Sequence, residues 1–393
     1  MVGDNPGSAP HDDEPTVGER ANVRSELNRL REFARRLSID EIRQGEWFAR
    51  LLRFSLDQYV RDVDATYLQQ KYRGLPADAI VQARIELAAR YASIEGGLSA
   101  GAYTGAVAAT IGSGGRASPL TLPAAGASFV LDMLYMSNLQ LRLAHDIAVL
   151  YRVPLDLDDP EDLWKLIRVA FAIKSGEAGR EAIGKGVPAL LRPFLRKVFS
   201  GSTLAAARSL PVVGKYLLQR NVIKFAIPAV GVPLSIAANY WSAKVAGNQA
   251  VKVFRSEARI VEAARWITER NPHHSELLWV LWLVIKADAL IHENERSLLK
   301  HVTGLVRDID SELAALTNLE RTIDLDQKRV WAMLASVEGD LEALYDAGVA
   351  AAAVDGKINV NELTVLKKLA EHCSVPYDES AIRRAAADVA RGR

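Results

Sequence analysis

The sequence predicts an all-α protein, in which a glycine-rich apolar helical domain is followed by a helical bundle with an internal two-fold repeat. Ala, Leu, Arg and Glu dominate the 393 residues. β-branched residues never alternate with polar ones for long, so strand patterns are nearly absent. Long uncharged runs rich in small residues occupy the middle of the chain, and a 15-residue segment near the C-terminus occurs twice. The runs predict the apolar domain, and the duplication predicts the repeat.

The N-terminal part divides into a tail and a helical region. Residues 1–20 carry five acidic side chains against one arginine, together with Pro and Gly, and this composition predicts a disordered acidic tail. Residues 21–92 are predicted to form two or three charged amphipathic helices, because apolar residues recur at one-face spacing. One such face consists of Leu27, Leu30, Phe33 and Leu37.

Residues 93–268 are predicted to form a second helical domain, whose middle is depleted of charge. The only charged residue between 96 and 131 is Arg116, and residues 225–243 have none. Small residues recur at every fourth position in both runs, and on a helix this spacing makes a smooth groove for close backbone approach. The positions are Gly97, Gly101, Gly105 and Ala109 in the first run, and Gly231, Ser235, Asn239, Ala243 and Gly247 in the second.

The length of each run allows a membrane-spanning helix, which needs about 20 residues. Pro119 and Pro123 interrupt the first run, and Pro228 and Pro233 interrupt the second. These prolines favour a buried or an interfacial hairpin over a simple spanning helix. All three alternatives remain open from the sequence.

A basic segment lies between the two uncharged runs. Residues 180–224 hold nine Lys or Arg against one acidic residue, and apolar side chains such as Leu190 and Phe194 are interleaved with the cations. An apolar face flanked by cations suits an anionic membrane surface, to which each cation contributes about 1 kcal/mol. The alternative is a solvated helix that packs on its own domain. Nucleic acid is not an expected partner, because no aromatic platform or recognised module accompanies the charge.

Three motifs of the middle region occur in one order. A small-residue run leads into Leu122-Pro123, residues 144–151 read AHDIAVLY, and residues 227–231 read IPAVG with Asn239 eight residues later. On these motifs, residues from about 85 to 265 resemble the EcsC family, although Arg152 stands where family members usually have Gly. The resemblance implies a bacterial protein associated with membrane processes, from a family whose biochemical activity is poorly defined.

Two local patterns have the residue types of catalytic or metal sites. His145-Asp146 could be a base with its orienting carboxylate, but adjacent helical residues point in different directions, so a helix-surface pair is expected. Asp159-Pro160 has the pattern of an N-cap followed by Pro at the first helical position. Helix capping is therefore favoured there over metal binding.

The C-terminal domain, predicted over residues 270–393, contains the duplication. Residues 288–302 align without a gap on residues 355–369, with six of 15 positions identical. The pattern predicts a duplicated unit of helix, acidic turn and helix. Two such units packed antiparallel would bring four carboxylates together as an oxygen-ligand site for a hard divalent cation. These carboxylates belong to Asp288, Glu295, Asp355 and Glu362.

The same residues also have an interpretation without metal. Asn359 followed by Glu362 has the pattern of a capping box, and an Asp in a turn can cap its own backbone. Capping explains one Glu locally but gives no reason for Asp and Glu to recur together, so both interpretations stay open. A conventional EF-hand loop is not expected, because Ala351 and Ala353 stand where that loop needs oxygen ligands.

With this acidic motif in both halves, residues from about 275 to 375 resemble a TerB-like domain. This family is the all-helical bundle of bacterial tellurite-resistance and related stress-response operons. The resemblance implies metal binding at Asp288, Glu295, Asp355 and Glu362. The first copy has Ala289 where the second has Gly356, so the two turns differ in this sequence.

Two functional hypotheses follow. The first is a non-enzymatic bacterial stress-response protein, cytoplasmic or peripheral on the inner membrane, which docks on anionic lipid and binds a divalent cation or a protein partner. The second is a metal-dependent hydrolase acting on membrane-derived substrates, with the same carboxylates as metal ligands. The first is favoured because catalysis has no other support in the sequence. A single cysteine, Cys373, excludes an intramolecular disulfide and favours a reducing compartment.

Overall fold

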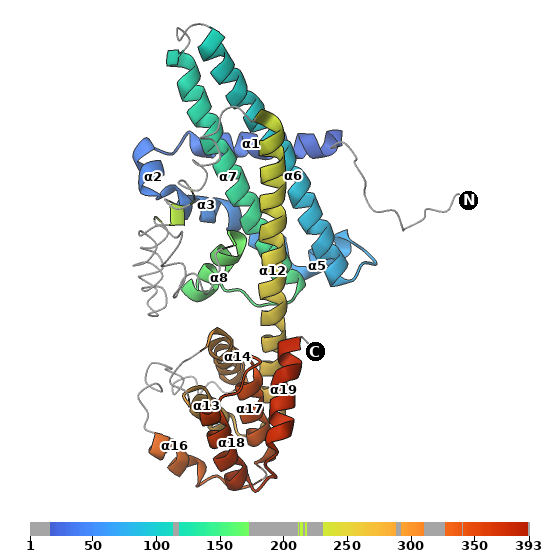
Figure 1. Ribbon diagram of the computed structural model, residues 1–393, viewed down its shortest axis with the longest axis vertical. Helices are drawn as coiled ribbons and strands as arrows, with labels where there is room; N and C mark the ends of the chain where they lie inside the picture. The colour runs from blue at the N-terminus through green and yellow to red at the C-terminus, as the bar shows by residue number, and fades with distance from the viewer. Residues whose placement is uncertain are drawn as a thin grey trace, which may run out of the picture. The chain divides into compact units, whose positions relative to one another are not determined.

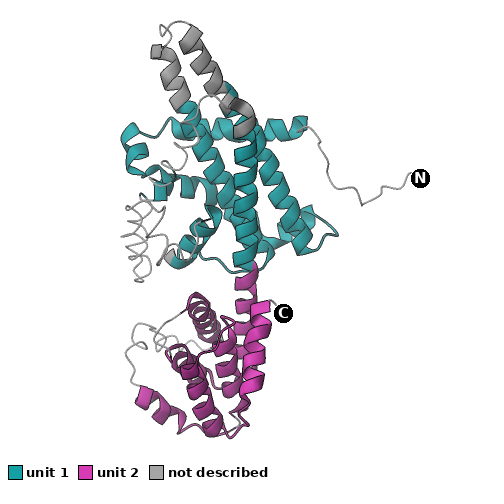
Figure 2. Cartoon of the chain, in the orientation of Figure 1, with its two compact units in different colours: residues 1–254 teal, residues 255–393 magenta. Residues whose placement is uncertain are grey.

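The computed structural model describes residues 16–112, 118–172, 231–287, 292–309, 327–339 and 341–391, together with residues 211, 213, 214 and 217. All regular structure within these residues is α-helical, which confirms the predicted fold class (Figure 1). The chain divides into two compact units, residues 1–254 and residues 255–393 (Figure 2). The N-terminal helices and the apolar helices, which the sequence separated at residue 92, belong to the same unit.

Short helices form the N-terminal part of the first unit. They are α1 (Val17–Ala34), α2 (Ile39–Gln44), α3 (Trp47–Leu56), α4 (Tyr59–Asp62) and α5 (Ala65–Lys71). A capping box begins α1, because the Glu19 N–H donates to Thr16 Oγ1 and the Thr16 N–H donates to Glu19 Oε2. The helix therefore begins within the predicted tail 1–20, of which residues 1–15 lie outside the described part.

Long helices follow. In the first unit, α6 (Ala77–Gly112) and α7 (Ser118–Leu150) lie side by side, and α8 (Pro160–Ala170) packs on α7 (Figure 1). The sequence treated Pro119 as a helix breaker, yet it lies in the first turn of α7. A proline is tolerated there because the first N–H groups of a helix have no intrahelical partner. The longest helix, α12 (Gly231–Arg270), extends from the first unit into the second.

Glycines allow α6 and α12 to approach closely in the first unit. A Cβ added to Gly96 would lie 2.8 Å from the carbonyl oxygen of Ser235, and one added to Gly247 would lie 2.7 Å from the Ile85 side chain. The small-residue stripe of α12 thus supplies positions at this contact. Among the α6 glycines whose surroundings the structure describes, the closest approach is at Gly96, one residue before the predicted stripe, whereas a Cβ at Gly101 would meet no atom within 4 Å.

We expect Gly96→Ala to lower the free energy of unfolding by about 1–3 kcal/mol, because its methyl group would force the α6 and α12 backbones apart. Gly101→Ala is the matched control. The added methyl group is unopposed there, and the higher helix propensity of Ala should stabilise the protein by about 0.5–1 kcal/mol. Urea unfolding of both variants measures the difference. Equal effects would contradict the close approach of the two helices.

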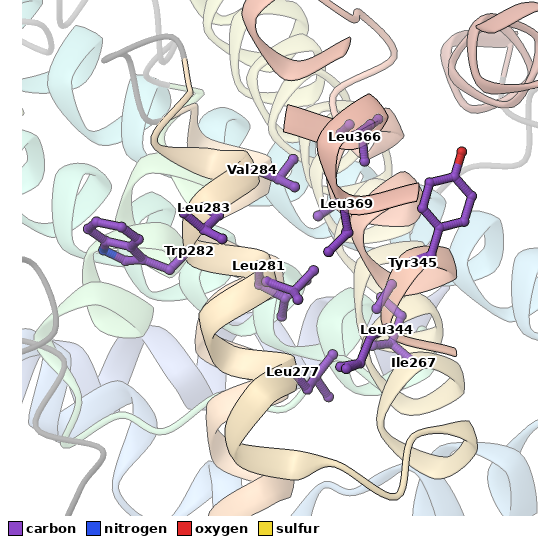
Figure 3. Packing of buried hydrophobic residues seen from close by; sticks show 14 of the residues in the cluster. Ile267, Leu277, Leu281, Trp282, Leu283, Val284, Leu344, Tyr345, Leu366 and Leu369 are labelled. Carbon is purple, nitrogen blue, oxygen red and sulfur yellow. The ribbon is translucent and has the colours of Figure 1, made fainter. Parts of the chain in front are cut away.

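The second unit is a bundle around one hydrophobic core. Besides the end of α12, its helices are α13 (His274–Ile285), α14 (Glu293–Ile309), α16 (Gln327–Leu334), α17 (Glu342–Ala353), α18 (Val360–Cys373) and α19 (Glu379–Arg391). α13 is almost wholly apolar, and its Leu277, Leu281 and Val284 pack against α17 and α18 (Figure 3). Ile260, Ala264 and Ile267 of α12 belong to the same core. This packing explains why the unit begins at residue 255 rather than at the predicted residue 270.

Candidate functional site

The two acidic segments of the duplication fall at the junctions of helices in the second unit. The second includes the turn between α17 and α18, and the first falls between α13 and α14, where the structure describes it only in part. Asp288 falls within residues 288–291, outside the described residues, whereas Glu295, Asp355 and Glu362 are all described. The structure therefore describes three of the four predicted ligands.

Glu295 and Glu362 cap the helices on which they lie. Glu362 Oε2 accepts a hydrogen bond from the Asn359 N–H at 2.8 Å, and Asn359 Oδ1 accepts one from the Glu362 N–H at 3.0 Å. This arrangement confirms the capping box that the sequence predicted. Glu295 Oε2 accepts from the His292 N–H at 2.7 Å in the same way. Both glutamates are almost fully buried, with exposed fractions of 1% and 3% for Glu295 and Glu362.

Asp355 forms the turn that precedes α18. Its Oδ1 accepts a hydrogen bond from the Lys357 N–H at 2.7 Å, which is the Asx-turn geometry typical of this residue type. The intervening Gly356 has φ +78°, a left-handed conformation that glycine adopts without strain. The first copy has Ala289 at the equivalent position, outside the described residues. The carboxylate of Asp355 is thus held by its own backbone.

The two acidic turns contact each other. His292, at the start of the first copy's second helix, places its Nε2 4.0 Å from Asp355 Oδ2. Asn294 Nδ2 donates to the backbone carbonyl of Val354 at 3.4 Å. Segments 60 or more positions apart in sequence therefore meet next to the acidic turn of the second copy. Within the described residues, however, no three His, Cys, Asp or Glu side chains are gathered closely enough to hold a metal ion.

The first unit contains a buried ion pair at Asp146, and the predicted surface position of His145-Asp146 is wrong. His145 and Asp146 were expected at a helix surface, but their exposed fractions are 3% and 0%. Arg84 Nε donates to Asp146 Oδ2 at 2.8 Å, and the Tyr59 hydroxyl donates to Asp146 Oδ1 at 2.8 Å. Helices from three parts of the chain cover α7 here, so both neighbouring residues are enclosed although they point in different directions.

Burial determines the protonation of this network. It raises the pKa of Tyr59, and the adjacent Asp146 raises it further. For Arg84, burial alone would lower the pKa, but Asp146 and Tyr59 together outweigh it, so the pKa is raised and the guanidinium stays charged. Burial lowers the pKa of His145, while Asp146 opposes that shift. His145 is therefore neutral in the folded protein near neutral pH.

A cavity of about 380 Å³ adjoins the network between α1, α5, α6 and α7. Arg142, in its wall, bonds to Glu26 Oε1 at 3.2 Å and stacks over the Tyr59 ring at 4.9 Å. The arginines of the cavity are thus already engaged by protein groups, which does not favour an anionic ligand. No sequence pattern indicated this cavity, because its lining residues come from separate helices.

A second buried polar cluster joins α6, α7 and α12. Asn239 Nδ2 donates to Glu95 Oε2 at 3.0 Å and to Asp132 Oδ1 at 2.9 Å. Ser99 Oγ donates to Glu95 Oε1. Glu95, Asp132 and Asn239 have exposed fractions of 0%, 3% and 2%. Asp132 Oδ2 has no hydrogen-bond partner among the described residues.

Two further groups with nucleophilic side chains have structural positions. Residues 97–101 match G-x-S-x-G, a pattern overlooked in the sequence, but Ser99 lies in the interior of α6 and donates a hydrogen bond to Glu95. The strand, turn and helix that this motif requires are not found there. Burial raises the pKa of the Cys373 thiol to about 11, so the reactive thiolate is scarce near neutral pH. Asp159 caps α8 with Pro160 at the first position, as predicted.

The regions predicted to meet a membrane are described only in part. Residues 180–224 lie outside the described residues except for 211, 213, 214 and 217. No helix of the described chain is both long enough and apolar enough to cross a membrane. Apolar side chains are nevertheless exposed in the first unit, with 69% of Trp241, 38% of Leu98 and 36% of Ile236 accessible.

Comparisons with protein-family models, with curated proteins and with solved structures found no match for the chain. The resemblances to the EcsC family and to TerB-like domains therefore rest on the sequence motifs alone. The geometry of this chain is the remaining basis for assigning a function.

We expect the stability of the first unit to fall as the pH decreases below about 6.5, the ordinary pKa of histidine. The unfolded chain takes up a proton at His145 in this range, whereas the folded chain resists it because the folded pKa is lower. His145→Gln should weaken this pH dependence, and His274→Gln, at a partly exposed position, should leave it unchanged. Calorimetric melting between about pH 5 and 8 measures the effect. An unaltered profile for His145→Gln would contradict the assignment.

Proposed function

We propose that the chain is a non-enzymatic bacterial stress-response protein that docks on the inner face of an anionic membrane and binds a divalent cation. The second unit would be a TerB-like bundle with an internal two-fold repeat, and the first would be a glycine-rich EcsC-like domain. Asp288, Glu295, Asp355 and Glu362 would supply the metal ligands. A protein partner is the other ligand considered for the second unit.

The observation that carries the metal proposal is the contact between the two acidic turns. His292 and Asn294 of one turn lie against Asp355 and Val354 of the other. This proximity is what a site shared by the two copies requires, since ligands from both must reach one ion. The caps at Glu295 and Glu362 hold one oxygen of each carboxylate and thereby limit side-chain rotation. Restricted ligands lose less conformational entropy on binding.

The lining of the groove next to Asp355 favours a binding role over hydrolysis. This groove of about 810 Å³ lies in the second unit, and Asp355 and Asn294 are among its lining residues. Of the three predicted metal ligands that the structure describes, only Asp355 lines it. Its described walls are largely apolar, with Trp266 and Val389 among them. A metal-dependent hydrolase needs an open metal position with a general base beside it. The described walls contain no histidine, and their one glutamate is Glu262.

Divalent cations should raise the melting temperature of the full-length protein, because the ion binds the folded state and not the unfolded chain. An excess of about one hundredfold over the dissociation constant adds about 2.7 kcal/mol. Glu362→Gln should keep most of the helix stability, since Gln also serves in a capping box, but it should weaken the metal response. Calorimetric titration with magnesium, calcium, manganese and zinc identifies the ion.

The matched control is Glu371→Gln, which makes the same carboxylate-to-amide change at an exposed position of α18. It should leave the metal response intact. If the wild-type protein gives no saturable heat with any of the four ions, capping alone explains the acidic residues. The groove beside Asp355 would then favour a protein partner as the ligand of this unit.

The membrane part of the proposal is supported by the exposed apolar side chains of α12. Trp241, Ile236 and Val245 have exposed fractions of 69%, 36% and 37%. They lie on or beside the uncharged run 225–243. Tryptophan is typical of the boundary between lipid and water, where its ring is apolar and its N–H is solvated. The nine cations of residues 180–224 would add attraction to anionic lipid.

The protein should float with anionic vesicles and be released by high salt, because salt screens attraction between surface charges. Flotation with phosphatidylcholine vesicles that contain graded amounts of phosphatidylglycerol measures this binding. Equal binding to neutral vesicles would remove the electrostatic part of the proposal. Resistance to extraction by alkaline carbonate would instead indicate insertion of a hairpin.

A further inference from the structure

The first unit has a groove with two arginines on one side and apolar residues on the other. It has a volume of about 380 Å³ and lies between α1, α6 and α12. Arg20 and Arg24 come from α1, and the apolar residues are Ile94 and Leu98 from α6 and Ile236 from α12. We call this feature the Arg20–Ile236 groove.

Neither arginine of this groove has an ion-pair or hydrogen-bond partner for its side chain in the described structure. Other arginines nearby are paired: Arg29 Nη1 lies 3.1 Å from Glu26 Oε2, and Arg90 Nη2 lies 3.0 Å from Glu19 Oε1. Arg20 and Arg24 are four residues apart on α1, so their side chains emerge on the same face. The groove therefore carries two adjacent positive charges that the described residues do not neutralise.

The position of α1 is fixed by contacts on either side of Arg20. The Glu19–Arg90 ion pair and the hydrogen bond from Asn22 Nδ2 to the Tyr91 hydroxyl at 3.1 Å attach α1 to α6. Val23 and Leu27 of α1 are buried, with exposed fractions of 0% and 6%. The backbone that carries the two arginines is thus fixed next to the apolar residues before any ligand arrives, while their side chains stay exposed. Such preorganisation lowers the entropic cost of binding.

The opposite side of the groove determines the class of ligand. Leu98 and Ile236 remain about one-third exposed although both are large and apolar. Inorganic phosphate would use the arginines but would leave these side chains in water. A phospholipid satisfies both sides, because its phosphate matches guanidinium groups and its acyl chain covers aliphatic side chains.

We propose that the Arg20–Ile236 groove binds an anionic phospholipid of the membrane, with the headgroup phosphate at Arg20 and Arg24 and the start of an acyl chain along Leu98 and Ile236. This inference rests on the proposed membrane docking and specifies where it occurs. It is independent of the basic segment 180–224. The groove adjoins the start of the uncharged run at residue 96, so a bound lipid would place that run at the membrane surface.

The test uses the full-length protein and vesicles of phosphatidylcholine with added phosphatidylglycerol. Arg20→Ala combined with Arg24→Ala should weaken binding by about tenfold or more. Arg43→Ala combined with Arg53→Ala is the control, since it removes the same charge from two exposed arginines of α2 and α3. The control should change binding by less than about threefold. Equal losses in the two double variants would overturn the groove while leaving electrostatic docking in place.

A second variant tests the apolar side of the groove. Leu98→Asn keeps the net charge and should weaken binding to the same vesicles by about threefold or more. An unchanged affinity would overturn the lipid assignment. Unaltered melting temperatures of all variants show that loss of binding is not loss of folding.

Short-chain phosphatidylglycerol below its micelle concentration separates the groove from membrane docking. If the wild-type protein fails to float but binds this soluble lipid, and the Arg20/Arg24 double variant does not, the groove stands and the docking proposal falls. If inorganic phosphate competes as well as the lipid does, the site recognises phosphate only and the lipid assignment is overturned. Saturable lipid binding that phosphate does not displace, and that the double variant loses, supports the assignment.

Discussion

The first unit depends on one interaction, the bridge that Asn239 makes between Glu95 and Asp132. Its single amide group donates to both carboxylates, so three long helices meet at one fully buried polar point. A buried carboxylate costs several kcal/mol unless it is hydrogen-bonded, and other registers of these helices would leave both carboxylates without this donor. The close approach at Gly96 makes the bridge possible, because a side chain there would collide with Ser235 and Asn239. The polar cluster therefore specifies how α6, α7 and α12 align.

This alignment has consequences for the surface. Glu95 and Asp132 immediately flank the run 96–131, whose only charged residue is Arg116, and the structure brings these two flanking residues together at Asn239. One turn of α6 away, Ile94, Leu98 and the α12 residue Ile236 form the apolar side of the Arg20–Ile236 groove. A shift of α12 along α6 would separate Ile236 from Leu98 and remove the groove. The hydrogen bonds of Asn239 therefore also fix the geometry of the proposed lipid groove, because both depend on the same alignment of α6 and α12.

The sequence predicted features that depend on neighbouring residues. Residues within one turn of each other determine the helical secondary structure. They also determine the capping box of Asn359 with Glu362 and the cap at Asp159. Four carboxylates were expected to lie within reach of one another. Asn294 does contact Val354, but within the described residues no three His, Cys, Asp or Glu side chains are gathered closely enough to hold a metal ion. The four-ligand site itself stays a prediction, since Asp288 lies outside the described residues.

Features that depend on tertiary packing were not predictable in the same way. The face of α7 that carries His145 is buried because other helices cover it, and no local sequence pattern predicts that burial. Arg84 and Tyr59, which bond to Asp146, are separated from it by more than 60 residues. The sequence also does not reveal that Arg20 and Arg24 differ from the arginines that form ion pairs, because pairing depends on which carboxylates lie nearby in the folded protein.

Capping and metal binding are not exclusive roles for the acidic residues of the second unit. A cap engages one carboxylate oxygen with a backbone N–H, and a carboxylate has capacity for several further contacts. The cap at Glu362 fixes that side chain at the start of α18, and the cap at Glu295 does the same on α14. A ligand that is already oriented loses little rotational freedom when an ion binds, so the caps would strengthen a metal site rather than compete with it. The same reasoning explains why both copies would keep Asp and Glu at the same spacing. In the second copy, Asp355 accepts from the Lys357 N–H within its turn, and Glu362 caps the helix that follows.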